Sequence, residues 1–272
     1  MDKEEIRKKL KNNFLKRLIF RIDFSGMMDA DVEKFIQNIR PRILESGYTV
    51  LKEEFGNNVN VNVLSPKNIE TSNEITKIYV FNSKHGKELK ISKSFVIFEI
   101  DIERNKTLFS SYTPLISYII EELKAMEFVQ FDRIGLRKIN VCILLNKRKL
   151  NQYFKDKVLC RFDDESSVTQ VADELYAEDY KVNFNRRFQE GTILEEGNTK
   201  VVYQILLDID SYMDDNEKVD QNIRENDSSE ILKKLNDIIY DIYIESLDSL
   251  FIDKLVINSF DDDEIRGVTK NV

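Results

Sequence analysis

A single segment, residues 131–145 (FDRIGLRKINVCILL), combines the composition of a buried β-strand with a glycine and an arginine near its centre. Ile, Val and Leu dominate this segment and proline is absent, as expected of a strand. Alternate side chains of a strand share one face, so Arg137 is predicted on the same face as Ile139 and Val141. An arginine among aliphatic neighbours needs a carboxylate or an anion, because an unpaired buried charge is too costly. Gly135 indicates a bulge or a close approach to the backbone.

The composition is that of a globular protein and argues against several functional classes. The chain of 272 residues is long enough for one large domain or two half-domains. A formal net charge of -8 argues against a protein whose main task is to cover nucleic-acid backbones. There is no apolar signal-peptide run at the start, no segment with the ~20 apolar residues of a membrane helix, and only two cysteines. We therefore predict a cytoplasmic protein.

Apolar periodicity predicts several helices and strands along the chain. Amphipathic spacing predicts helices over residues 29–45, 113–123 and 228–246. In the first of these, Pro41 predicts a kink and Gly47 stands where a C-terminal cap belongs. Alternating or continuous apolar runs predict strands over 15–24, 48–55, 58–64, 78–82, 88–92, 94–102, 131–145, 180–188 and 201–209.

Three further segments have weaker patterns. We expect residues 166–177 to be helical or irregular. Residues 214–227 are charged and nearly devoid of apolar side chains, which predicts a surface loop. Residues 251–260 are expected to close the fold as an extended segment.

The two halves of the chain have a similar order of elements. In the first, FVIFEIDI is followed by a long helix and RIGLRKIN; in the second, YQILLDID is followed by a long helix and FIDKLVIN. This order predicts two related ββαβ units, although a chain rich in Ile and Asp also produces such matches by chance. We predict an α+β fold, mainly antiparallel sheet in two similar halves, each covered by a long helix. The halves span 14–146 and 147–260, followed by a flexible acidic tail at 261–272.

The motif at residues 133–140 resembles the R-x-G-L-R-Y-x-N signature of a sporadically distributed bacterial family of unknown function. This chain has Lys138 where the family usually has tyrosine or another aromatic residue. A later pattern of that family, without its histidine, is similar to Leu235, Leu247, Phe251 and Ile257. The order of elements agrees from about residue 15 to residue 260. The resemblance implies the fold and brings no established activity, but families with such a scattered distribution are often carried on defence loci, which implies phage defence as one setting.

The first candidate site pairs Arg137 with Glu99 or Asp101, beside Gly135. Strands on either side of a helix are often neighbours, so Arg137 is predicted to meet one of these carboxylates across the ladder. We favour a structural ion pair that fixes the register of the strands. An anion-binding site built on Arg137 is the alternative.

The second candidate site is a group of aspartates after the strand at 201–209. Asp208 and Asp210 share one face, and Asp214 follows them. Carboxylates at a strand end can hold Mg²⁺, which makes a metal-dependent nuclease or phosphoesterase the catalytic alternative. Strand-ending aspartates also serve as turn and cap acceptors, and this is the interpretation we favour.

A third candidate is a short basic patch formed by Lys147, Arg148 and Lys149, followed by Tyr153. Cations interleaved with an aromatic ring can bind nucleic acid, so a nucleic-acid-binding accessory protein is a further alternative. A solvated surface balanced by nearby acids is the interpretation we favour.

Catalytic signatures are otherwise absent from the sequence. One histidine, His85, cannot build a His-dependent triad or a multi-histidine metal site, and no phosphate-cradling glycine loop occurs. We therefore predict a non-catalytic interaction or regulatory module that recognises a protein partner, with a homodimer as one form of it. No cofactor and no membrane are expected.

Overall fold

The computed structural model describes residues 2–65, 68–105, 109–159, 167–195, 197–260, 265–266 and 269–270. The helical elements are α1 (Lys3–Lys9), α2 (Asp29–Glu45), η1 (Phe109–Ser111), α3 (Thr113–Lys124), η2 (Lys147–Lys149), α4 (Leu150–Tyr153), α5 (Asp156–Leu159), α6 (Asn216–Glu225), α7 (Ser228–Ser246) and α8 (Ser249–Ile257). The strands are β1 (Asn12–Asn13), β2 (Leu15–Ser25), β3 (Val50–Ser65), β4 (Asn68–Asn82), β5 (Lys87–Ile91), β6 (Phe95–Asp101), β7 (Gln130–Leu144), β8 (Val168–Ala177), β9 (Tyr180–Glu195), β10 (Asn198–Met213), β11 (Ile265–Arg266) and β12 (Thr269–Lys270).

Within the described residues, one antiparallel sheet runs through the molecule in the order β3-β4-β5-β6-β2-β7-β10-β9-β8, and β11 adds to β7. The predicted α+β fold with a mainly antiparallel sheet is confirmed. The two halves meet where β2 pairs with β7, with Phe20 opposite Leu136.

The two halves of the sheet follow a similar order of elements, although the first has the additional strand β3 and the second the additional helix α6. A first strand (β2 or β7) leads through a helical connection to an antiparallel meander (β3-β4-β5-β6 or β8-β9-β10), whose last strand pairs with that first strand. A long helix, α3 or α7, then follows the meander. Strand order thus places β7 at the start of the second half. The predicted ββαβ unit was wrong, because FIDKLVIN forms helix α8 and not a strand.

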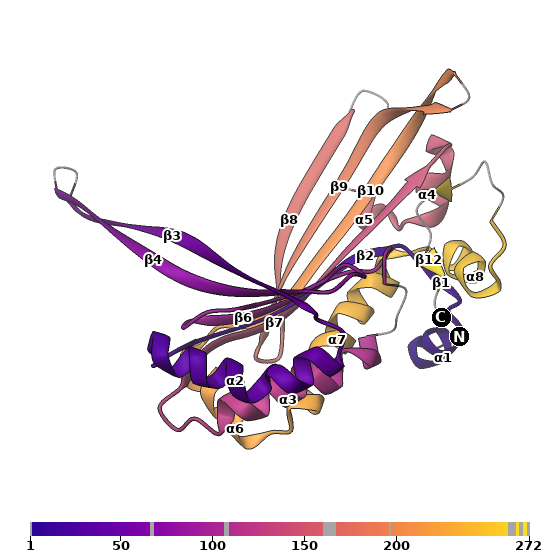
Figure 1. Cartoon of the computed structure of the whole chain (residues 1–272). Coiled ribbons are helices and arrows are strands. Elements are labelled where there is room, and N and C mark those ends of the chain that lie inside the picture. Colours follow the sequence, from indigo (N-terminus) through magenta and orange to yellow (C-terminus); the bar gives the residue numbers. More distant parts are fainter. Residues whose placement is uncertain are drawn as a thin grey trace.

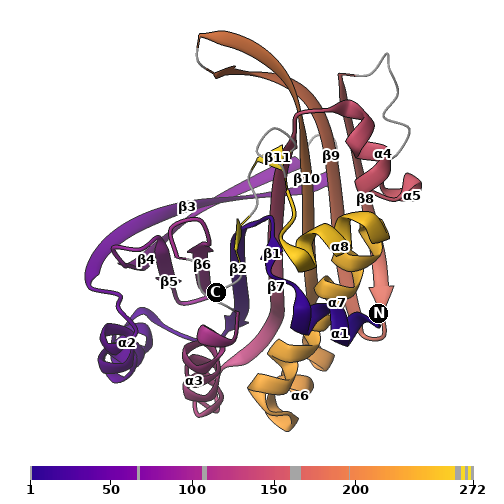
Figure 2. The same cartoon turned by 90° about the vertical axis from the view of Figure 1, so that its right-hand side faces the viewer.

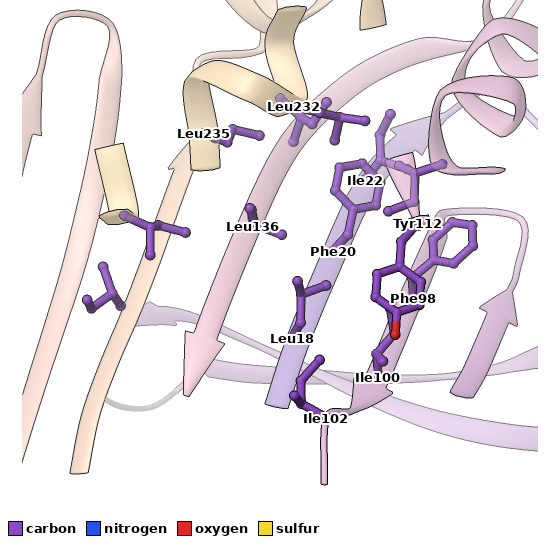
Figure 3. Packing of buried hydrophobic residues seen from close by; sticks show 14 of the residues in the cluster. Leu18, Phe20, Ile22, Phe98, Ile100, Ile102, Tyr112, Leu136, Leu232 and Leu235 are labelled. Atoms are coloured by element: carbon purple, nitrogen blue, oxygen red, sulfur yellow. The ribbon is translucent and has the colours of Figure 1, made fainter. Parts of the chain in front are cut away.

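Helices α2, α3, α6 and α7 lie on one face of the sheet, as Figure 1 and the perpendicular view in Figure 2 show. The core lies between these helices and the sheet. In Figure 3, Phe20 and Ile22 of β2 lie beside Leu136 of β7, and Leu232 of α7 packs close to them. The opposite face of the sheet stays open between the ribbon of β3 and β4 and the strands β8–β10 (Figure 1).

The long amphipathic helices match their predicted bounds. The α2 and α7 helices span residues 29–45 and 228–246, as predicted, and α2 continues through Pro41. Gly47 adopts a left-handed conformation (φ 88°) just after α2, as its capping position predicted. Burial of one apolar stripe, repeated at helical spacing, explains why these elements were readable from the sequence.

Several weaker patterns were misread. The Gly-Asn-Asn sequence at 56–58 forms no turn, because β3 continues through it while paired with β4. Residues 168–177 form the edge strand β8, where one free side tolerates polar side chains. The predicted loop at 214–227 contains α6, which buries Val219 and Ile223. The segment expected to be extended after residue 250 is helical to Ile257.

The chain ends contribute short elements. Residues 3–9 form α1, and Asn12 and Asn13 pair with the two residues of β12. The described residues of the segment predicted to be a flexible acidic tail pair with β7 and with β1. No helix in the described part of the chain is long and apolar enough to cross a membrane.

Candidate functional site

The helix-free face of the sheet, called the open face below, carries most of the predicted site residues. Strand alternation turns the core residues of β2, β6, β7 and β10 toward the helices and their neighbours in sequence toward this face. The charged residues on the open face include Arg17, Arg21, Glu99, Arg133, Arg137, Asp208 and Asp210.

Arg137 forms a two-pronged ion pair with Asp208 of β10. Its Nε donates to Asp208 Oδ1 at 2.7 Å and its Nη2 donates to Oδ2 at 2.6 Å. The Asp208 side chain is 10% exposed and that of Arg137 is 43% exposed. The hydrogen bond to Asp208 raises the pKa of Arg137 above its ordinary value. A guanidinium held at both prongs is fixed in orientation, so this pair fastens β7 to β10.

Gly135 makes room for a second ion pair beside the first. Arg133 Nη2 donates to Asp210 Oδ2 at 3.0 Å, with its guanidinium 4.8 Å from the centre of the Tyr212 ring. A Cβ atom on Gly135 would lie 2.9 Å from Tyr212 Cβ and 3.1 Å from both Arg133 Nη atoms. The register of β7 is regular at this point. Gly135 therefore allows the side chains of Arg133 and Tyr212 to approach the strand closely, and it does not mark a bulge. Burial raises the pKa of Asp210, an effect that the charges of the two arginines oppose.

The remaining polar residues of the motif face the helices. Asn140 is buried, and its Nδ2 donates to the Leu207 carbonyl at 3.2 Å. Lys138 Nζ donates to Asn236 Oδ1 of α7 at 2.5 Å. Arg133, Arg137 and Asn140 thus each connect β7 to β10, while Lys138 connects β7 to a helix.

The predicted partners of Arg137 were wrong, because β2 lies between β6 and β7. Glu99 pairs instead with Arg17 at 3.1 Å, and Asp101 pairs with Arg104 at 3.3 Å. Strands β6 and β7 lie on either side of α3 in the sequence, which suggested that they pair in the sheet. Strand β2 lies between them instead. The predicted type of contact, an arginine–carboxylate pair across a ladder, is present with Asp208.

The aspartates proposed as metal ligands are each engaged by a cation. Asp208 pairs with Arg137, Asp210 with Arg133, and Asp214 with Lys181 at 2.8 Å. In the described residues, no group of three or more His, Cys, Asp or Glu side chains is placed to hold a metal ion. The carboxylates therefore balance the basic residues of the open face.

The basic patch lacks the aromatic surface that the sequence suggested. Lys147, Arg148 and Lys149 form the 3-10 turn η2. Tyr153 is fully buried and stacks on Phe251, with ring centres 4.4 Å apart. It has no face free to stack on a base, so its predicted nucleic-acid role was wrong.

The histidine and the described cysteine lie at positions that suggest no catalytic role. His85 is exposed in the turn between β4 and β5. Cys142 is fully buried in β7, and burial raises the pKa of its thiol. Cys160 lies outside the described residues.

Two ribbons of the sheet carry exposed apolar side chains that sequence patterns did not single out. β4 pairs with β5 only over Tyr79–Asn82, so its earlier residues pair with β3 alone. On this ribbon Phe55 and Ile75 are 68% and 70% exposed. Beyond the ends of β7 and β8, the tips of β9 and β10 likewise pair only with each other. There Leu194 and Val201 are 77% and 47% exposed.

No protein-family model matches the chain, and no curated protein is detectably similar to it in sequence. The likeness of residues 133–140 to the R-x-G-L-R-Y-x-N family remains a prediction.

Proposed function

We propose that the protein is a non-catalytic module that binds a protein partner through its two projecting ribbons. The observation that carries this proposal is the exposed apolar pair on each ribbon. Phe55 and Ile75 lie on one side of the β3–β4 ribbon, one step apart across the ladder. Leu194 and Val201 have the same relation on the β9–β10 ribbon. Diagonal neighbours on one face of a ladder lie within reach of each other, so each pair offers one small apolar surface.

The low intrinsic stability of a two-stranded ribbon supports a role in binding a partner. A two-stranded ribbon is only marginally stable in water, and it gains from a third strand or a packed face. The outer strand β3 also presents an unpaired backbone edge along its length, which a partner can extend. Apolar surface left exposed at such places is typical of interaction sites.

The charges of the open face favour this function over the two alternatives. Arg17, Arg133 and Arg137 each face a carboxylate, so this face does not offer the unbalanced positive charge that phosphate backbones require. The carboxylates of the metal-dependent alternative are engaged in the same pairs. A bacterial cytoplasmic setting, and phage defence in particular, is part of the proposal on the family resemblance alone.

Site-specific photo-crosslinking tests the proposal. A photoreactive phenylalanine analogue replaces Phe55 or Leu194, and as a control Leu44, an exposed residue of α2. We expect a discrete crosslinked product from the two ribbon positions and not from position 44. The identified partner, once purified, should bind the wild-type chain at least about tenfold more tightly than a chain with Ile75→Asp and Val201→Asp.

Two outcomes contradict the proposal. One is the same crosslinked product from position 44 as from the ribbons. The other is unchanged affinity after both substitutions, with folding verified by circular dichroism. If analytical ultracentrifugation instead detects a dimer that the substitutions abolish, the partner is a second copy of this chain.

A further inference from the structure

A small cavity lies on the helix side of the sheet, away from the open face. It has a volume of about 100 Å³ and lies between α7, β7 and the segment that leads into β2. Its walls are formed by Leu10, Asn13, Leu15, Lys138, Asn140, Ile239, Tyr240 and Tyr243. Most of this wall is apolar or aromatic, and the size suits a molecule of a few heavy atoms.

Lys138 contributes a cationic side chain to the wall of this cavity, and its ammonium lies 5.4 Å from the centre of the Phe109 ring. Its ammonium donates to the neutral Asn236 side chain, and within the described residues no carboxylate lies at ion-pair distance from it. The nearest acid in sequence to Asn236 is Asp237, which is held by Arg7 at 2.6 Å and Lys233 at 2.7 Å. Burial, and then the charge of Arg7, lower the pKa of Lys138 to about 8, although the charge of Asp237 acts in the opposite direction. An ammonium has three donor hydrogens, so Lys138 retains donors for a bound group.

Tyr243 adds a second unsatisfied donor. Its side chain lines the cavity and is 6% exposed, and its hydroxyl has no hydrogen-bond partner in the described structure. The backbone of Phe14 lies close to this hydroxyl without hydrogen-bond geometry. A buried hydroxyl without an acceptor is costly, so a ligand that accepted its hydrogen bond would be stabilised here.

We propose that this cavity binds a small aliphatic carboxylate, with Lys138 and Tyr243 donating to its two oxygens and Leu10, Leu15 and Ile239 contacting its chain. One cation and one neutral donor beside an apolar wall match the two ends of such a molecule. A carboxylate here neutralises the ammonium in a site that otherwise penalises its charge. It also satisfies the buried hydroxyl. The site is independent of the ribbons and does not depend on the proposed partner.

Titration of the wild-type chain with butyrate, followed by calorimetry and by backbone NMR shifts, tests the site. Butyramide, a neutral molecule of nearly the same shape, is the ligand control. We expect saturable binding of butyrate in the millimolar range, with shifts in residues around Lys138 and Ile239 and at least about tenfold weaker binding of butyramide.

Variants connect the binding to the two donors. Lys138→Met should weaken butyrate binding at least about tenfold, and Tyr243→Phe about three- to tenfold. Lys234→Met is the matched control, because Lys234 lies on α7 but pairs with the distant Glu178. Thermal melts verify folding, and Lys138→Met removes a charge whose burial is unfavourable, so the variant is expected to fold. Equal binding of butyramide, undiminished binding by Lys138→Met, or no saturable binding of butyrate would each overturn the proposal.

Discussion

The two halves of the sheet have a similar order of elements, but different ion pairs connect their strands on the open face. In the first half, Arg17 of β2 pairs with Glu99 of β6, and their side chains are 55% and 29% exposed. In the second half, Arg137 of β7 pairs with Asp208 of β10, whose side chain is almost buried. Water and salt weaken an exposed pair, whereas a shielded pair keeps its strength and is costly to break. The same topology thus carries a weak ionic contact in one half and a strong one in the other.

The seam between the halves has a second asymmetry. Leu18 of β2 stands opposite Lys138 of β7, and both turn toward the helices. Leu18 is buried in the core, while Lys138 reaches Asn236 of α7. At this pair of positions the first half contributes the aliphatic side chain of Leu18, and the second half contributes the cation of Lys138.

The largest effect is expected from removing the shielded carboxylate. Asp208→Ala should lower the free energy of unfolding by about 2 kcal/mol, because it removes the two charge-assisted hydrogen bonds that Arg137 donates to a carboxylate that is 10% exposed. The equivalent change in the first half, Glu99→Ala, should cost no more than about 1 kcal/mol. Urea denaturation of both variants measures the difference. Equal losses would mean that the two halves are fastened alike.

Gly135→Ala should cost about 1–2 kcal/mol, because the new methyl group meets Tyr212 and the Arg133 guanidinium within about 3 Å. Gly191 of β9 is the control, since a Cβ there meets only Val202 Cγ2 at 3.9 Å. Gly191→Ala should be neutral or stabilise by up to ~1 kcal/mol. Urea denaturation measures both variants. An unchanged free energy of unfolding for Gly135→Ala would show that the Arg133 guanidinium can move away from the new methyl group.

The cation at the seam should make stability depend on pH. The pKa of Lys138 is about 8 in the folded chain, below the ordinary lysine value of 10.5, so between these two pH values the unfolded chain binds more protons. Stability from this group should therefore rise as pH increases from about 8 to about 10.5. Thermal melts across this range should lose that rise in Lys138→Met. A variant with an unchanged pH profile would assign the dependence to other groups.

The smallest effect on stability is expected at the ribbons. Ile75→Asp and Val201→Asp change exposed side chains, so each should alter the free energy of unfolding by no more than about 0.5 kcal/mol. Denaturation curves check this for both ribbons. A loss comparable to that of Asp208→Ala would indicate that these side chains pack within the chain and are not free for a partner.

Local patterns predicted the elements whose burial repeats at a regular spacing. The α2 and α7 helices bury one stripe each, and their bounds were predicted correctly. Helix α8 was misread, because a short apolar run does not distinguish strand from helix. Its end signals were nevertheless in the sequence: Asp248 caps the start, and Asn258 ends the helix in a left-handed conformation. Helix α6 was missed because only Val219 and Ile223 mark its buried face within a segment that is otherwise polar and charged.

The sequence by itself determined that Arg137 needs a carboxylate or an anion, and that Gly135 marks either a bulge or a close approach. These requirements follow from the cost of a buried charge and from the missing Cβ, both of which act within a few residues. Only the tertiary structure decided that the partner is Asp208, because the insertion of β2 between β6 and β7 is a long-range choice of strand order. The exposed ribbons and the Lys138 cavity were decided in the same way, since exposure and enclosure depend on which distant elements pack beside a residue.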